Sequence, residues 1–285
     1  MVSRLELYKE CLEILERSEI ADSEFDVLCI FQDMLRDKNP MFKPNENVPE
    51  EAETKIRSLV KKLTDGEPLQ YLLGEWEFWG YPFKVGKGVL IPRPDTETLV
   101  EEVLRICRGY GLDSPKIADL CSGSGCIAVA LKKELPDAEV CAMELSKDAL
   151  YYLRENVKRN NVDVRVISAD VLDPKSAELL NGSDIIVSNP PYLTAEDMSD
   201  LQTEVAKEPS MALFGGEDGL DFYRKMTRLW KNSLKTGGFL CYEFGMGQHE
   251  SVGMLLKANG FTDIEFAKDA GGIIRTVTAR KTEEC

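Results

Sequence analysis

The sequence predicts an α/β fold, with a mostly parallel seven-stranded sheet preceded by a small N-terminal helical domain. Apolar residues recur at helical spacing through about residue 72, whereas strand and helix patterns alternate from Lys116 onward. Between these regions, residues 73–85 alternate aromatic and charged side chains around a Gly turn, which is typical of a β-hairpin. We therefore expect a helical domain at 1–72, a β-hairpin linker at 73–95 and an α/β domain at 96–285.

The elements follow in order from breaks in these patterns. The helical domain has stripes beginning at Leu5, Phe25 and Ile56, interrupted by Asn39-Pro40 and ended by Gly66-Glu67-Pro68. A helix at 96–108 precedes a doubly wound sheet. Its expected strands are Lys116–Leu120, Glu139–Met143, Val164–Ser168, Asp184–Ser188, Phe239–Glu243, Phe261–Phe266 and Ile273–Ala279, with helices at 125–134, 147–160, 219–235 and 247–259. Only Lys268–Gly272 separates the last two strands, which is too short for a parallel crossover, so we expect them to be antiparallel.

Composition narrows the classes of function. A hydrophobic content of 43% with 30% charged residues is typical of soluble globular proteins. The net charge of −15 disfavours binding to a phosphate backbone, so we expect no direct nucleic-acid partner. His249 is the only histidine, which disfavours a Ser-His-Asp triad or a His-rich metal site, and no metal is expected. The eight cysteines form no C-x-x-C pair, and the sequence has no long uncharged apolar run and no signal-peptide h-region. We therefore expect a cytoplasmic protein without membrane contact.

The most informative motif is Asn189-Pro190-Pro191-Tyr192, which follows an apolar strand directly. Proline cannot donate to a β ladder, so the strand should end at Asn189, on the edge where open α/β sheets bind ligands. The Asn189 side-chain oxygen and nearby carbonyls can accept hydrogen bonds from an –NH2 group, and Tyr192 offers an aromatic face. The motif therefore suits a planar amino or amide nitrogen, although a rigid turn capped by an asparagine is the alternative.

A glycine-containing loop, Cys121-Ser122-Gly123-Ser124-Gly125, follows the first strand of the sheet. Such loops bring bare backbone against a ligand at a helix N-terminus. Glu144 ends the next strand, at the distance where a carboxylate binds ribose hydroxyls, and Asp170-Val171 follow the third strand, where they would flank an adenine. Gly123 to Ala128 also match the G-x-G-x-x-A dinucleotide fingerprint, so NAD competes with S-adenosylmethionine as the cofactor. Asn189–Tyr192 favours S-adenosylmethionine, because methyl transfer to an –NH2 group uses such a motif and hydride transfer does not.

Together these residues resemble the class I (Rossmann-like) S-adenosylmethionine-dependent amino-methyltransferases. Further segments resemble, more narrowly, the peptide-chain release factor glutamine methyltransferases (the PrmC or HemK family), over essentially the whole chain. They are Pro68–Gly74, Glu77-Phe78, Leu90-Ile91-Pro92-Arg93-Pro94-Asp95-Thr96-Glu97, Gly219–Tyr223, Glu243-Phe244-Gly245 with Gln248, and Asp269–Gly272. Cys121 stands where many members have a glycine, a place that a small thiol can occupy if its backbone stays in a common region.

The resemblance implies methylation of the glutamine side-chain amide in the Gly-Gly-Gln motif of class I release factors, with a role in translation termination. It implies that residues 121–125 (Cys121, Ser122, Gly123, Ser124, Gly125), Glu144, Asp170, Val171 and Asn189 contact S-adenosylmethionine. Asn189, Pro190, Pro191, Tyr192 and Arg93 would contact the substrate, with Asn189, Pro190 and Tyr192 acting in catalysis. The helical domain would dock the release factor, and a monomer is the default. A DNA or RNA amino-methyltransferase, an NAD-dependent oxidoreductase and a non-catalytic adenosylmethionine-binding adaptor remain as alternatives.

Overall fold

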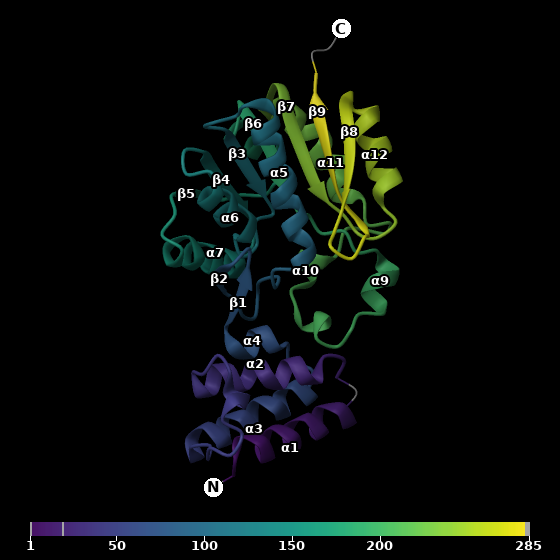
Figure 1. Cartoon of the computed structure of the whole chain (residues 1–285). Helices are drawn as coiled ribbons and strands as arrows, with labels where there is room; N and C mark the ends of the chain where they lie inside the picture. Colours follow the sequence, from purple (N-terminus) through teal and green to yellow (C-terminus); the bar gives the residue numbers. More distant parts are fainter. Residues whose placement is uncertain (1, 19, 283–285) are drawn as a thin grey trace. The chain divides into compact units, whose positions relative to one another are not determined.

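The computed structural model describes residues 2–18 and 20–282, which fall into two compact units. The first unit is built from the residues up to Gly74 together with Gln202–Lys207, and the second from Glu75–Leu201 and Glu208 onward. The first is helical, as predicted. It contains α1 (Arg4–Arg17), α2 (Ser23–Leu35), α3 (Glu50–Thr64) and α4 (Leu69–Leu73), and a 3-10 turn at Pro40–Phe42 (Figure 1).

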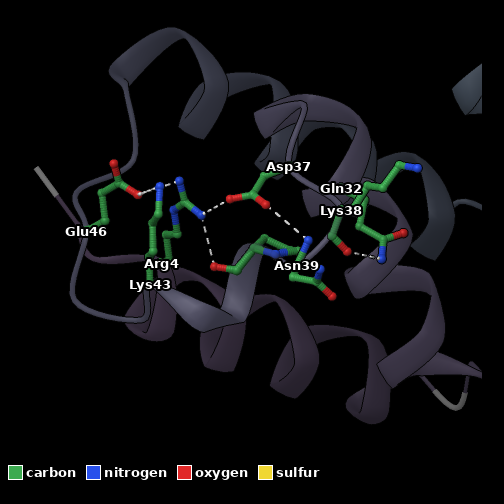
Figure 2. Close-up of polar contacts among 8 residues, drawn as sticks. Arg4, Gln32, Asp37, Lys38, Asn39, Lys43 and Glu46 are labelled. Carbon is green, nitrogen blue, oxygen red and sulfur yellow. Dashed lines mark hydrogen bonds and ion pairs between the residues drawn. The ribbon is translucent and has the colours of Figure 1, made fainter.

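A nearly buried arginine joins the start of α1 to the connection after α2 (Figure 2). The Arg4 guanidinium donates to Asp37 Oδ2 at 2.8 Å and to the Pro40 carbonyl at 3.0 Å, and it pairs with Glu46 at 2.6 Å. The hydrogen bond from Arg4 lowers the pKa of Asp37. Ser3 and Glu6 form a capping box at the same helix start. These side-chain hydrogen bonds and ion pairs therefore hold the irregular connection between α2 and α3 against the start of α1.

The second unit begins with the expected hairpin, β1 (Glu75–Phe78) and β2 (Tyr81–Lys84), which are antiparallel around Trp79-Gly80. A 3-10 turn at Pro94–Thr96 leads into α5 (Glu97–Tyr110). The sheet has the order β5-β4-β3-β6-β7-β9-β8. Its strands are β3 (Lys116–Leu120), β4 (Glu139–Glu144), β5 (Val164–Ser168), β6 (Ser183–Ser188), β7 (Leu234–Glu243), β8 (Phe261–Lys268) and β9 (Ile274–Lys281).

Pairing from β5 through β7 is parallel, whereas β9 is antiparallel to both β7 and β8, as predicted for the last two strands. Alternating strand residues enter two separate cores, one on each face of the sheet. Helix α5 shares its core with α6 (Cys126–Glu134) and α7 (Lys147–Arg159). The opposite core holds α8 (Pro174–Glu178), α11 (Asp221–Trp230) and α12 (His249–Ala258). The predicted doubly wound fold is confirmed.

One predicted boundary is wrong. The helix expected at 219–235 ends at Trp230, and after a 3-10 turn at Lys231–Ser233 the chain enters β7 at Leu234. Leu234 pairs with Ser183, and the register then shifts before Ile185 meets Phe239. Tertiary pairing has extended the strand backwards through Gly237-Gly238, where the sequence carries no strand signal. No helix within residues 2–18 or 20–282 has the length and apolar content needed to cross a membrane.

Candidate active site

The carboxyl ends of three neighbouring strands bring the predicted site residues to one edge of the sheet. Leu120 on β3 lies opposite both Met143 on β4 and Ser188 on β6. The residues that follow each of these positions are therefore neighbours in space: the loop from Cys121, the carboxylate of Glu144, and Asn189. This edge lies where the strand order changes direction around β3, at the position where doubly wound sheets bind ligands.

A cavity with about 1060 Å³ of empty space, counted to its open mouth, lies at this edge within the second unit. Its walls come from seven segments, and many of the side chains are apolar. The lining includes Gly88–Arg93, Thr96, Cys121–Ser124, Cys126, Ile127, Glu144–Ser146, Ala149, Asp170–Leu172, Asn189, Pro191, Pro209, Met211, Ala212 and Phe222.

Glu144 is held by backbone donors on both of its oxygens. Gly123 N–H donates to Oε2 at 2.8 Å, and the N–H groups of Leu145 and Ser146 each donate to Oε1 at 2.8 Å. These bonds tie the glycine loop to the end of β4 and fix the carboxylate at the cavity wall. A carboxylate has about four acceptor sites, so it can also accept from a ligand hydroxyl.

The backbone of Cys121 does not lie in one of the common regions. Its φ is +58°, in the left-handed region that costs a non-glycine residue roughly 1–2 kcal/mol. The loop must reverse between the end of β3 and α6, and this geometry explains why a glycine often occupies the position in the family that the sequence resembles. Burial raises the pKa of the Cys121 thiol, with a further contribution from Glu144.

This strain gives a stability prediction. Cys121→Gly and Cys121→Ala both remove the thiol, but only glycine relieves the left-handed backbone. We expect the glycine variant to be more stable than the alanine variant by about 1 kcal/mol, although glycine normally ranks below alanine. Urea unfolding of the two variants without ligand measures the difference. An alanine variant of equal or greater stability would show that the loop relaxes to another conformation.

Gly125 contributes through packing, since it does not line the cavity. Its φ is +82°, and a Cβ placed there would lie 2.3 Å from Leu153 Cδ1 on α7. Glycine at this position lets α6 start close against the neighbouring helix. The residue was predicted to contact the cofactor; it lies outside the cavity lining and packs against Leu153.

Asn189 is half-buried at the cavity, and the nitrogen of its side-chain amide is held by a hydrogen bond. Asn189 Nδ2 donates to Thr96 Oγ1 at 3.2 Å. Glu243, at the end of β7, is 1% exposed and lies next to Thr96 and Asn189. Burial raises the pKa of Glu243 to about 7, opposed by the Thr96 hydrogen bond.

The turn after Asn189 is clamped from two directions. Gln248 Nε2 donates to the Tyr192 carbonyl at 2.9 Å, while Gln248 Oε1 accepts from Gly245 N–H at 2.9 Å. A Cβ on Gly219 would lie 2.2 Å from the Tyr192 carbonyl oxygen, so this approach requires glycine. Tyr192 itself is half-buried next to the cavity lining, and burial raises the pKa of its hydroxyl.

Arg93 lies in the cavity wall and is paired with a buried carboxylate. The Arg93 guanidinium bonds to Glu208, whose side chain is only 2% exposed. The second Glu208 oxygen accepts from Ile91 N–H at 2.9 Å. Glu208 therefore anchors the 91–93 segment along the cavity. No sequence pattern marks Glu208 as a partner of this segment, because it lies over a hundred positions further along the chain.

The cavity is acidic. Glu144 and Asp170 line it, and Arg93 is the one cation among the described lining residues. Beneath the loop, the Asp119 side chain is fully buried. Burial raises the pKa of Asp119 to about 8. Val171, which is 5% exposed, forms part of the apolar wall, and its carbonyl accepts from Trp230 Nε1 at 2.8 Å.

Most of the predicted site residues line this one cavity. Gly125, Pro190 and Tyr192 lie outside the lining. The walls that were not predicted include Thr96, Leu145, Ser146, Pro209, Met211, Ala212 and Phe222. Ser188 on β6 pairs with Tyr242 on β7, so the residues that follow them, Asn189 and Glu243, are neighbours. The position of Glu243 beside Asn189 therefore follows from the strand ends. The fold and cavity together define a Rossmann-like methyltransferase.

Comparison with known proteins supports this class and specifies the family. Residues 96–216 match the methyltransferase small domain, and residues 6–74 match the PrmC N-terminal domain. The release factor glutamine methyltransferase of Fusobacterium nucleatum is 36% identical over 97% of this chain and 78% of its own length. That of Geobacter sulfurreducens is 42% identical over 81% and 79%. The chain belongs to the release factor glutamine methyltransferase family.

Similarity to solved structures adds evidence for the fold. The catalytic domain of human Mettl16, solved with an RNA hairpin, aligns with a TM-score of 0.57 over 84% of each chain at 14% identity. At this identity the likeness describes the fold alone. It shows that the sheet and its helices follow a methyltransferase arrangement.

Proposed function

We propose that this protein transfers a methyl group from S-adenosylmethionine to the side-chain amide nitrogen of the glutamine in the Gly-Gly-Gln motif of class I release factors. The observation that carries the proposal is the half-buried Asn189 at the cavity, with its Nδ2 bound to Thr96. Its Oδ1 is left to accept from a planar –NH2 group. Family membership selects a glutamine amide among such groups.

The cavity suits S-adenosylmethionine better than NAD. S-Adenosylmethionine carries a sulfonium and an ammonium, which favour the carboxylates of Glu144 and Asp170. A dinucleotide pyrophosphate would meet these same carboxylates and only one arginine, already paired with Glu208. Glu144 would accept from the ribose hydroxyls, Val171 and Leu172 would pack on the adenine, and residues 121–124 would border the methionine part.

In the proposed mechanism the protein acts mainly by placement. A glutamine amide nitrogen is a poor nucleophile, because its lone pair is delocalised into the carbonyl. Bound S-adenosylmethionine supplies an electrophilic methyl group, so that an N–C bond forms as the S–C bond breaks. Asn189 Oδ1 and the Pro190 carbonyl each accept one amide N–H and aim the nitrogen, and such placement supplies roughly 7–11 kcal/mol of a barrier. Tyr192 packs against the glutamine, and the proton leaves to water.

The N-terminal helices would form the docking domain for the release factor, and the acidic chain suits a protein substrate at least as well as DNA. We propose that the enzyme is cytoplasmic and acts as a monomer.

Labelled S-adenosylmethionine tests the function directly. The purified enzyme is expected to label a class I release factor on the glutamine of its Gly-Gly-Gln motif, with the position fixed by mass spectrometry. The Gln→Ala release factor and a duplex DNA should stay unlabelled. Equal label on both release factors, or label on DNA, would contradict the proposed substrate. The protein would then be an amino-methyltransferase that acts on another group.

A further inference from the structure

A short polar relay connects Asn189 to the buried residues Thr96 and Glu243. Asn189 Nδ2 donates to Thr96 Oγ1 at 3.2 Å, and the Glu243 carboxyl lies close enough to both side chains for hydrogen bonding with them to lower its pKa. Thr96 is 2% exposed and Glu243 1% exposed. The three residues come from the turn before α5, the end of β6 and the end of β7, which the fold brings together.

The direction of this relay depends on the proton of Glu243. An ionised carboxylate can only accept, so Thr96 must donate its single hydroxyl proton to it. The Thr96 oxygen then accepts from Asn189 Nδ2, which leaves Asn189 Oδ1 as the acceptor for the substrate amide. A protonated Glu243 can instead donate to Thr96 or to Asn189 Oδ1, and the amide is no longer held in one orientation.

We propose that Glu243, acting through Thr96, is a positioning residue that fixes the orientation of the Asn189 amide in the productive sense. This inference rests on the proposed function of Asn189 as acceptor for the substrate amide. A second observation supports it: Glu243 Oε2 has no hydrogen-bond partner among the described residues, which is a costly arrangement for a carboxyl that serves packing alone.

The relay makes turnover depend on pH. Burial raises the pKa of Glu243 to about 7, so its ionised, orienting form is populated above that pH. The titratable and charged groups facing Glu243 are Asp95, Cys126, Tyr192, Tyr223 and Arg275. Burial raises the pKa of the cysteine and of both tyrosines above their ordinary values, so these three keep their protons between pH 6 and 8. Because the folded pKa is raised, ionisation of Glu243 also costs stability as pH rises through about 7.

Four proteins test the relay: wild type, Glu243→Gln, Thr96→Val and Thr96→Ser. With saturating release factor and cofactor, wild-type kcat should rise with pH around a midpoint near 7. Both Glu243→Gln and Thr96→Val should lose this rise of kcat with pH. Their kcat should be about 10-fold lower, since the loss of substrate positioning lowers rates by this order or more. Thr96→Ser keeps the hydroxyl and should restore the wild-type profile. Affinity for S-adenosylhomocysteine, measured by calorimetry, should change less than 3-fold in all variants, a small effect on the scale of about 10-fold per 1.4 kcal/mol.

A substrate-free readout separates this inference from the proposed function. In ¹⁵N-labelled protein, the Asn189 side-chain NH2 signals should shift with a midpoint near pH 7 in wild type and stay constant in Glu243→Gln. If kcat of Glu243→Gln still rose with pH, or if Thr96→Val turned over at the wild-type rate, the relay would be contradicted. If wild type labels no release factor while the Asn189 signals titrate as described, the proposed substrate fails and the relay stands. Without that titration the relay fails, whatever the substrate.

Discussion

Replacing Asn189 by alanine is expected to lower kcat for methyl transfer by about 10²–10³-fold, the usual effect of removing one preorganised hydrogen-bonding group at a reacting centre. The side chain follows β6 directly, and its Nδ2 is already bound to Thr96, so alanine removes a pre-aimed oxygen. Cofactor affinity should fall much less, because the Glu144 carboxylate and the glycine loop stay in place. Single-turnover kinetics and calorimetry with S-adenosylhomocysteine measure the two effects separately.

The matched control is Asn181→Ala. Asn181 lies just before the other end of β6 and is exposed, and it should leave both kcat and affinity unchanged. Equal losses of turnover and of cofactor affinity in Asn189→Ala would contradict its assignment to the transferring step. They would point to a structural role in the turn before Tyr192.

The fold was accessible from sequence because each of its layers has a local signal. Helical stripes marked the first unit, and the alternation of apolar strands with helices marked the parallel sheet from Lys116 onward. The short link Lys268–Gly272 fixed the antiparallel end. The start of β7 was missed, because its first residues are ordered by pairing with Ser183 and carry no period of their own.

The candidate site was accessible to the extent that it follows strand ends. Glu144 and Asn189 were found because parallel strands bring their carboxyl ends to one edge, and the observed register does so. Glu208 and Thr96 act through tertiary contacts with segments far away along the chain, and no local pattern marks such contacts. Cys121 shows the converse limit: a backbone dihedral is dictated by the loop path, even against the preference of the residue.

Replacing Glu144 by glutamine should have the opposite signature, with loss of cofactor binding. Both Glu144 oxygens accept backbone N–H bonds, Oε2 from Gly123 and Oε1 from Leu145 and Ser146. A glutamine NH2 in either orientation must therefore face a donor, so even this isosteric change disrupts the loop or the start of the 145–146 segment. It also removes the charge that strengthens bonds to ribose hydroxyls, each worth about 1.5–3 kcal/mol.

We therefore expect Glu144→Gln to weaken S-adenosylhomocysteine binding by at least about 10²-fold, corresponding to two lost tenfold steps of 1.4 kcal/mol. At saturating S-adenosylmethionine, kcat should fall less than in Asn189→Ala, because the acceptor for the substrate amide remains. Glu139→Gln is the control at the other end of β4, where the carboxylate forms an exposed pair with Lys116 at 3.4 Å that contributes little. If Glu144→Gln instead lowered kcat with unchanged affinity, Glu144 would act on the reacting groups, and the cofactor would have to bind elsewhere along the edge.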